Sequence, residues 1–240
     1  MLKKFIIYQC YKHTLSTIIL CDSLPSSRTA GWKIYSIPER IFMEYDTLSR
    51  NFIIKKNPMK IVLDIGCGHE KIKPKRGEKV IGIDSIKDEG VDIVHNLEKP
   101  LPFPDNYADG IYSNHAFEHV QNAKQLIEEC FRVAKPGAEI YIRVPHYTST
   151  GMYTDLTHRT FFSSRSLDYY IDSTYLSTMS GYNSKIRFKI IKKRIMFDIP
   201  YKLLEWIVNH NDTTRKVYEY FFCWIFPAQD IVFIVSPIKT

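Results

Sequence analysis

A glycine turn between two apolar runs constrains the fold of this chain more than any other feature. Residues 60–71 read KIVLDIGCGHEK, so a short β-branched and apolar run ends at Asp64 and then breaks at two glycines. A second apolar run, at 80–83, ends on Asp84. Glycines let a ligand approach the backbone closely, and an acid after the second strand accepts hydrogen bonds from ribose hydroxyls. The pattern therefore predicts two strands of an α/β fold that binds a nucleoside.

Strands and helices alternate along the chain from residue 60 onward. Apolar runs bounded by turn residues indicate strands, and apolar residues at helical spacing indicate helices. This alternation predicts an α/β, Rossmann-like three-layer sandwich, with a mostly parallel seven-stranded sheet and an antiparallel edge strand. The predicted strands are 61–65, 80–84, 91–94, 109–113, 139–144, 186–197 and 230–236, and the predicted helices are 122–132, 201–208 and 213–222.

Two segments differ in character from the alternating part. Residues 1–58 form an N-terminal appendage that we expect to be partly helical, because residues 40–52 have apolar residues at helical spacing. Residues 59–240 form the main domain, with a helical, aromatic insertion at about 199–228. That insertion is interpreted as a helix packed on the sheet or on a partner in a homodimer, or as a lid over an apolar substrate near an anionic membrane.

The segment between the first two strands argues against a dinucleotide as the ligand. Dinucleotide-binding folds follow their glycines with a helix whose N-terminus faces a pyrophosphate. Here Gly68 is followed by a short span that contains Pro74, and a full helix does not fit there. The ligand is therefore predicted to be a nucleoside without a pyrophosphate.

Net charge and cysteine usage indicate the kinds of partner and the cellular compartment to expect. The net charge of +7 favours anionic partners such as nucleic acid, phosphorylated substrates or anionic membrane, although lysine-rich surfaces are also common without such a partner. The five cysteines are scattered, with no zinc-site spacing, which predicts reduced thiols and a cytoplasmic protein without a bound metal. No apolar stretch is long enough to predict a transmembrane helix.

Four motifs, in order over residues 60–145, resemble class I S-adenosylmethionine-dependent methyltransferases. They read VLDIGCG, VIGIDS, HNLEKPLPFPDNYADGIYSNHAFEHV and FRVAKPGAEIYIRVPH. The resemblance implies S-adenosylmethionine as the cofactor, with Asp64 at its methionine part, Asp84 on its ribose, and Asn96 and Leu97 along its adenine. We add Lys71 as a positive charge near the cofactor carboxylate, with a solvated loop lysine as the alternative. The predicted cofactor-binding set is Asp64, Gly66, Cys67, Gly68, Lys71, Asp84, Ser85, Asn96, Leu97, Asn114 and His115.

The region after the fifth predicted strand holds the candidate catalytic groups. Residues 146–162 read HYTSTGMYTDLTHRTFF and resemble a largely uncharacterised subset of methyltransferases encoded with polysaccharide or cell-surface genes. Methyl transfer to a hydroxyl needs a base, and we predict His158, oriented by Asp155, with His146 as second choice. The alternatives are histidines that only cap loops, or a metal site formed by His146, Asp155 and His158. His119 is interpreted as packing against the cofactor loop.

The leading functional hypothesis is methyl transfer to a hydroxyl, or less favourably an amine, of a small-molecule or glycan-like acceptor. Nucleic-acid methylation is an alternative that the positive charge favours. The sequence after the fourth strand, Ser113-Asn114-His115-Ala116, lacks the Asn/Asp-Pro-Pro-aromatic motif with which amino-methylating enzymes hold a flipped base. A third hypothesis is a non-catalytic protein that binds the cofactor and serves as a partner in an assembly.

Overall fold

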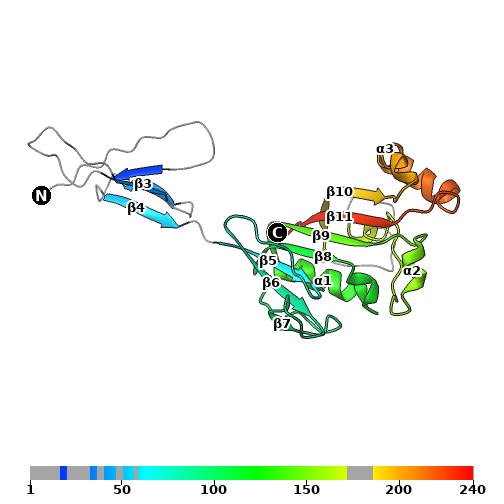
Figure 1. Cartoon of the computed structure of the whole chain (residues 1–240), viewed down its shortest axis with the longest axis horizontal. Helices are drawn as coiled ribbons and strands as arrows, with labels where there is room; N and C mark the ends of the chain where they lie inside the picture. The colour runs from blue at the N-terminus through cyan, green and yellow to red at the C-terminus, as the bar shows by residue number, and fades with distance from the viewer. Residues whose placement is uncertain are drawn as a thin grey trace, which may run out of the picture. The chain divides into compact units, whose positions relative to one another are not determined.

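The chain divides into two compact units, Met1–Met59 and Lys60–Thr240. The computed structural model describes residues 59–171 and 186–239 and, before residue 59, the backbone of four strands. Figure 1 traces the whole chain. The second unit carries every residue of the predicted cofactor and catalytic sets.

The first unit contains strands where a helix was predicted. β1 (Thr17–Leu20) pairs with β2 (Lys33–Ser36), and β3 (Ile41–Asp46) pairs antiparallel with β4 (Asn51–Lys56). The helix predicted over 40–52 is therefore wrong. Both β3 and β4 are rich in β-branched and aromatic residues, which favour strands, and only four residues of sequence separate them, a length that suits an antiparallel pair.

The second unit is built on one seven-stranded sheet in the order β10-β11-β9-β8-β5-β6-β7. The strands from β9 to β7 are parallel, and β11 runs antiparallel to its neighbours β9 and β10. The predicted mostly parallel, Rossmann-like sheet is therefore confirmed. Its strands are β5 (Lys60–Ile65), β6 (Glu78–Asp84), β7 (Ile93–Val94), β8 (Ala108–Asn114), β9 (Ala134–Pro145), β10 (Phe188–Met196) and β11 (Asp230–Pro237).

The register of the central strands gathers their carboxyl ends at one edge of the sheet. Ile65 of β5 pairs with Ile83 of β6 on one side and with Ser113 of β8 on the other. The loops that follow these three strands therefore begin side by side. Ligands of open parallel sheets bind at this edge, which is where the predicted cofactor turn lies.

Few helices cover this sheet. α1 (Ala123–Val133) is the longest in the described residues, and Figure 1 shows it against the sheet. Asn122 caps it by accepting a hydrogen bond from the Gln125 backbone N–H, and its apolar face, including Leu126 and Ile127, is buried. The connection between β5 and β6 contains turns and irregular backbone and no helix, as its short, proline-containing sequence predicts.

Three short helical regions lie in the rest of the described unit. The loop after β8 contains a 3₁₀ turn at Phe117–His119. After β9 come α2 (Thr150–Thr154) and a 3₁₀ turn at Asp168–Tyr170. Between β10 and β11 lies the predicted helical insertion. None of the described helices is long and apolar enough to cross a membrane. The insertion comprises a 3₁₀ turn at Tyr201–Leu203, α3 (Leu204–Val208), α4 (Asp212–Val217) and a π-helical turn at Tyr218–Phe222.

Candidate functional site

The glycine turn after β5 is packed directly against the loop after β8. Gly66 has φ +70°, and a methyl group added to it would lie 2.2 Å from the Cβ atom of Ala116. Gly68 has φ +57°, but a methyl group there would meet no atom within 4 Å. Left-handed backbone and a close approach both favour glycine. The turn is thus closed on the side of Ala116 and open at Gly68, where a ligand has room.

The carboxylate of Asp84 lies at the open side of this turn. Its Oδ2 atom accepts a hydrogen bond from the Gly68 N–H at 2.9 Å, and its Oδ1 atom accepts from the Ile86 N–H at 3.1 Å and from the Ser85 hydroxyl at 3.3 Å. A carboxylate offers about four lone-pair positions. Asp84 is therefore fixed in place and keeps capacity to accept a hydrogen bond from a ligand.

Asp64 and Cys67 line the buried side of the turn. Asp64 is almost fully buried, and its Oδ2 atom accepts from the Ile72 N–H at 2.7 Å. Burial raises the pKa of Asp64 above its ordinary value, against the lowering effect of that hydrogen bond. Burial, followed by the charges of Asp64 and Asp84, raises the pKa of the Cys67 thiol to about 11. Cys67 is therefore a neutral thiol at pH 7.

Lys71 makes an ion pair within the same region. Its Nζ atom lies 2.6 Å from Oδ2 of Asp92, which also accepts a hydrogen bond from the Gly82 N–H at 2.7 Å. These bonds lower the pKa of Asp92, although burial opposes them. The role of Lys71 toward the cofactor carboxylate stays a prediction.

The loop after β7 carries the two residues predicted along the adenine. The Asn96 Oδ1 atom accepts from the Glu98 N–H at 2.9 Å, and Leu97 packs against the core. The Glu98 carboxylate accepts from the Gln121 N–H at 2.7 Å. This bond ties the loop to the segment after β8, so both segments border the same edge of the sheet.

Asn114 and His115 end β8 at that edge. The Asn114 Oδ1 atom is buried and has no hydrogen-bond partner among the described residues. An unpartnered buried acceptor is costly unless a ligand or water satisfies it. Asn114 therefore offers an acceptor that a bound ligand can use.

His115 is held between two buried carboxylates. Its Nδ1 atom lies 3.1 Å from Oε1 of Glu118, and its Nε2 atom lies 3.7 Å from Oδ2 of Asp230. The nearby Asp230 carboxylate, and then the hydrogen bond with Glu118, raise the pKa of His115 to about 9. Asp230 also pairs with Arg143. His115 is therefore a cation at pH 7, and sequence reasoning missed its partner Asp230, whose only signal was an acid at the start of the last strand.

His119 and His158 meet at the same edge from segments far apart in the chain. Their ring centroids lie 4.6 Å apart. His158 Nδ1 lies 3.1 Å from the Met152 carbonyl oxygen, so this nitrogen donates. His119 Nδ1 lies 2.8 Å from the Thr157 hydroxyl oxygen, whose own hydrogen goes to Asp155 Oδ1 at 2.7 Å. A neutral form of either ring would therefore carry its hydrogen on Nδ1 and a lone pair on Nε2.

The predicted pair of His158 and Asp155 is brought together, but His146 lies elsewhere. His158 Nε2 is 3.8 Å from Asp155 Oδ2. His146 is fully buried, with Nδ1 2.6 Å from the Thr148 hydroxyl and Nε2 3.3 Å from Oε1 of Glu219. His146 as second base stays a prediction, whereas His119 has a more central place than its sequence interpretation gave it.

One group of side chains in the described residues could hold a metal ion. Ligand atoms of Glu118, His119 and His158 all lie within 4.8 Å of one another. The Glu118 Oε2 atom is buried without a partner among the described residues, and two imidazoles with a carboxylate are donors that Zn²⁺ accepts. The alternative set of His146, Asp155 and His158 is not assembled.

Comparison with known proteins bears on the part of this region that contains the glycine turn. Residues 63–142 match the family model for a methyltransferase domain. A probable S-adenosylmethionine-dependent methyltransferase of Mycolicibacterium smegmatis is 31% identical over 97 residues, which are 35% of this chain and 38% of that protein. The chain carries a class I S-adenosylmethionine-dependent methyltransferase domain. S-adenosylmethionine is accordingly its cofactor.

Other similar proteins are also named as methyltransferases. A demethylmenaquinone methyltransferase of Listeria welshimeri is 24% identical over 148 residues, 48% of this chain and 63% of that protein. A solved S-adenosylmethionine-dependent methyltransferase from Archaeoglobus fulgidus is 21% identical, with a TM-score of 0.44 over 75% of this chain and 86% of that chain. This chain spans less than two thirds of the length of these two curated relatives.

The geometry of the methyltransferase domain fits that cofactor. Gly68 leaves open space beside Asp84, whose carboxylate can accept from a ribose hydroxyl. The unpartnered Asn114 Oδ1 atom can accept from the cofactor's ammonium group. When bound, S-adenosylmethionine supplies an electrophilic methyl group on a sulfonium. The domain itself needs to bind it, align an acceptor and exclude competing water.

Proposed function

We propose that this chain transfers the methyl group of S-adenosylmethionine to a hydroxyl group of a small-molecule or glycan-like acceptor, with an amine as the less favoured acceptor. The observation that carries the proposal is the pair His119 and His158, whose rings lie together on the loops that follow β8 and β9, with Nδ1 of each ring engaged in a hydrogen bond. Demethylmenaquinone methyltransferases among the curated relatives support a small-molecule acceptor.

His158 is the general base in this proposal. The Met152 carbonyl holds its Nδ1–H, which leaves Nε2 to take the proton of the acceptor hydroxyl. The Asp155 carboxylate, 3.8 Å from Nε2, stabilises the imidazolium that forms. His115 is not suited to this role, because its pKa of about 9 keeps it protonated at pH 7.

The loop after β8 connects the base to the cofactor turn. Ala116 packs on Gly66, and Glu118 follows two residues later with its backbone carbonyl accepting from the Arg159 N–H at 2.7 Å. This bond holds the segment that contains His158 against the loop that touches the cofactor turn. In this proposal, an acceptor that reaches His158 is aligned with the methyl group of the cofactor bound at the turn.

Cofactor binding is tested first, by calorimetric titration with S-adenosylhomocysteine. We expect binding by the full chain and a loss of about ten- to a hundredfold in the Asp84→Ala variant, because the ribose loses a charged acceptor. A Lys71→Ala variant with unchanged affinity would remove Lys71 from the cofactor-binding set. No binding by the parent protein would refute both enzymatic function and cofactor binding.

The base is tested with S-adenosylmethionine labelled on its methyl group and a panel of acceptors that contains demethylmenaquinone and glycans. The His158→Gln variant should lose about a hundredfold or more in kcat while keeping its affinity for S-adenosylhomocysteine. The matched variant is His146→Gln, the second predicted base. If His146→Gln loses turnover and His158→Gln does not, the assignment of the base is reversed.

A further inference from the structure

The insertion between β10 and β11 carries a concentration of exposed apolar side chains. Of the eighteen large apolar side chains that are exposed in the described residues, ten lie in residues 199–225. Soluble proteins rarely expose contiguous apolar patches beyond a few hundred Å², and a single tryptophan can bury 150–250 Å². We call residues 199–225 the apolar insertion. Its most exposed large side chains are Ile199, Leu203, Trp206, Phe221 and Trp224.

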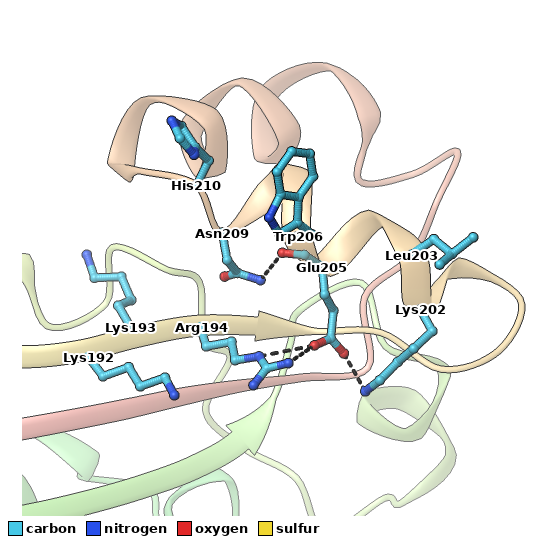
Figure 2. A pocket seen from close by; sticks show the side chains of 9 residues that line it. All are labelled: Lys192, Lys193, Arg194, Lys202, Leu203, Glu205, Trp206, Asn209 and His210. Carbon is cyan, nitrogen blue, oxygen red and sulfur yellow. Dashed lines mark hydrogen bonds and ion pairs between the residues drawn. The ribbon is translucent and has the colours of Figure 1, made fainter.

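A basic pocket of about 680 Å³ adjoins the apolar insertion. Figure 2 shows Lys192 and Arg194 reaching from β10 and Lys202 reaching from the insertion, with Trp206 standing above them. The lining includes four Lys and Arg side chains and a single carboxylate, that of Glu205. The excess of positive charge favours an anion in this pocket.

The charge in the pocket is only partly neutralised by the protein. Glu205 is buried and accepts hydrogen bonds from Arg194, Lys202 and the backbone N–H of Phe197. Two cations therefore share one carboxylate. Lys193 is paired separately, with its Nζ atom 2.9 Å from Oδ1 of Asp168 and 3.8 Å from Oδ1 of Asp212. Lys192 is exposed and has no ion-pair partner among the described residues. An anion bound in the pocket would balance the remaining positive charge.

The rim of the same pocket is apolar. Leu203 is 87% exposed and Trp206 is 81% exposed, and both line the pocket together with the lysines. On the other side of α3, a groove of about 290 Å³ is lined almost wholly by apolar atoms, including those of Ile207, Val217 and Phe222. An anion next to exposed tryptophan and leucine is the chemistry of a lipid headgroup above its acyl chains. Tryptophan and lysine are both favoured at membrane interfaces.

The apolar insertion is anchored to the carboxyl edge of the sheet. The buried Glu219 carboxylate accepts from the Ser164 N–H at 2.6 Å and from its hydroxyl at 2.8 Å, and it lies 3.3 Å from Nε2 of His146. The Arg165 guanidinium donates to the Tyr220 hydroxyl at 3.1 Å. These bonds fix the insertion to the loops after β9, so its exposed side chains are held in place.

We propose that the apolar insertion, together with Lys192, Arg194 and Lys202, docks the protein on an anionic lipid bilayer. The lipid phosphate occupies the basic pocket, and Leu203 and Trp206 enter the interface between headgroups and acyl chains. Binding does not depend on methyl transfer. It goes beyond the proposed function and can be measured whether or not an acceptor is known.

Co-sedimentation of the full chain with vesicles tests the proposal. Vesicles with about a third phosphatidylglycerol should bind at least about ten times more protein than vesicles of phosphatidylcholine alone, because each basic residue adds roughly fivefold in affinity for an anionic surface. Binding should fall as salt is raised. The Lys192→Glu variant and the Leu203→Ser/Trp206→Ser variant should each weaken binding by about tenfold or more.

The matched controls are Lys79→Glu and Ile238→Ser, which change an exposed lysine and an exposed apolar side chain outside this surface. Both should bind vesicles like the parent protein, and all variants should keep their affinity for S-adenosylhomocysteine. Three results would overturn the proposal. They are equal binding to both kinds of vesicle, saturation by inorganic phosphate without vesicle binding, and a dimer in light scattering that the Leu203→Ser/Trp206→Ser variant dissociates.

Discussion

The contact between the cofactor turn and the loop after β8 can be tested with one methyl group. In the Gly66→Ala variant the added Cβ would lie 2.2 Å from the Cβ of Ala116, and the backbone at φ +70° is strained for any L side chain. Gly68→Ala is the matched control, because its φ of +57° imposes similar strain while its Cβ meets no atom within 4 Å. The difference between the two variants isolates the steric contact.

The expected changes in unfolding free energy follow from three effects, of which two destabilise the folded protein and one stabilises it. Left-handed backbone costs an L residue about 1–2 kcal/mol, and replacing glycine returns about 0.4–1 kcal/mol by restricting the unfolded chain. Gly68→Ala should therefore lower the free energy of unfolding by about 1 kcal/mol. Overpacking adds about 1–3 kcal/mol for Gly66→Ala, for a total of about 2–4 kcal/mol. For a domain of this size that is a fall in Tm of roughly 4–16 °C.

A double-mutant cycle provides the decisive measurement. Ala116→Gly removes the clashing Cβ and leaves the Ala116 Cα, 3.5 Å from the added methyl group, as the nearest atom. The Gly66→Ala/Ala116→Gly variant should recover about 1–3 kcal/mol of unfolding free energy relative to the sum of the single changes. Thermal and urea unfolding measure all four proteins. If Gly66→Ala and Gly68→Ala are equally destabilised, or if the cycle shows no coupling, the close packing of turn and loop is refuted.

Two further predictions concern the histidines at the carboxyl edge. His115 has a folded pKa of about 9 against an ordinary value of 6.5, so its stabilising effect is complete below pH 6.5 and is lost as the pH rises through 9. The pKa shift corresponds to a stabilisation of ~3 kcal/mol, which solvent screening reduces to about 1–2 kcal/mol because the side chain is 37% exposed. Unfolding measured from pH 6 to 10 should show this loss of stability in the parent protein and not in His115→Gln. Identical pH profiles of the two proteins would contradict the prediction. Zn²⁺ should inhibit methyl transfer by occupying the Nε2 atoms of His119 and His158, and EDTA should restore activity. Competition with a chromophoric chelator should show zinc affinity about ten- to a hundredfold weaker in His119→Gln, and an unchanged affinity would remove His119 from the site.

The sequence predicted the strands and helices of the second unit because each is marked by a run or spacing of apolar residues and ends at a turn residue. The apolar runs before Asp64 and Asp84 gave two adjacent parallel strands, and the short segment with Pro74 excluded a helix between them. The prediction failed at 40–52, where apolar spacing fits a helix as well as a hairpin. Local spacing alone cannot separate those two conformations when strand pairing supplies the energy.

The sequence by itself therefore determined the individual strands, the glycine turn after β5 and the acid that ends β6, because each depends on residues close together in the chain. Only the tertiary structure decided which histidines share a site. His119 and His158 meet because the loops after β8 and β9 are joined by bonds between residues about forty positions apart. His146 is buried against Glu219, which lies 73 positions away in the apolar insertion. Such long-range contacts have no local signature. The same holds for the basic pocket beside Trp206, which exists because β10 and the apolar insertion pack together.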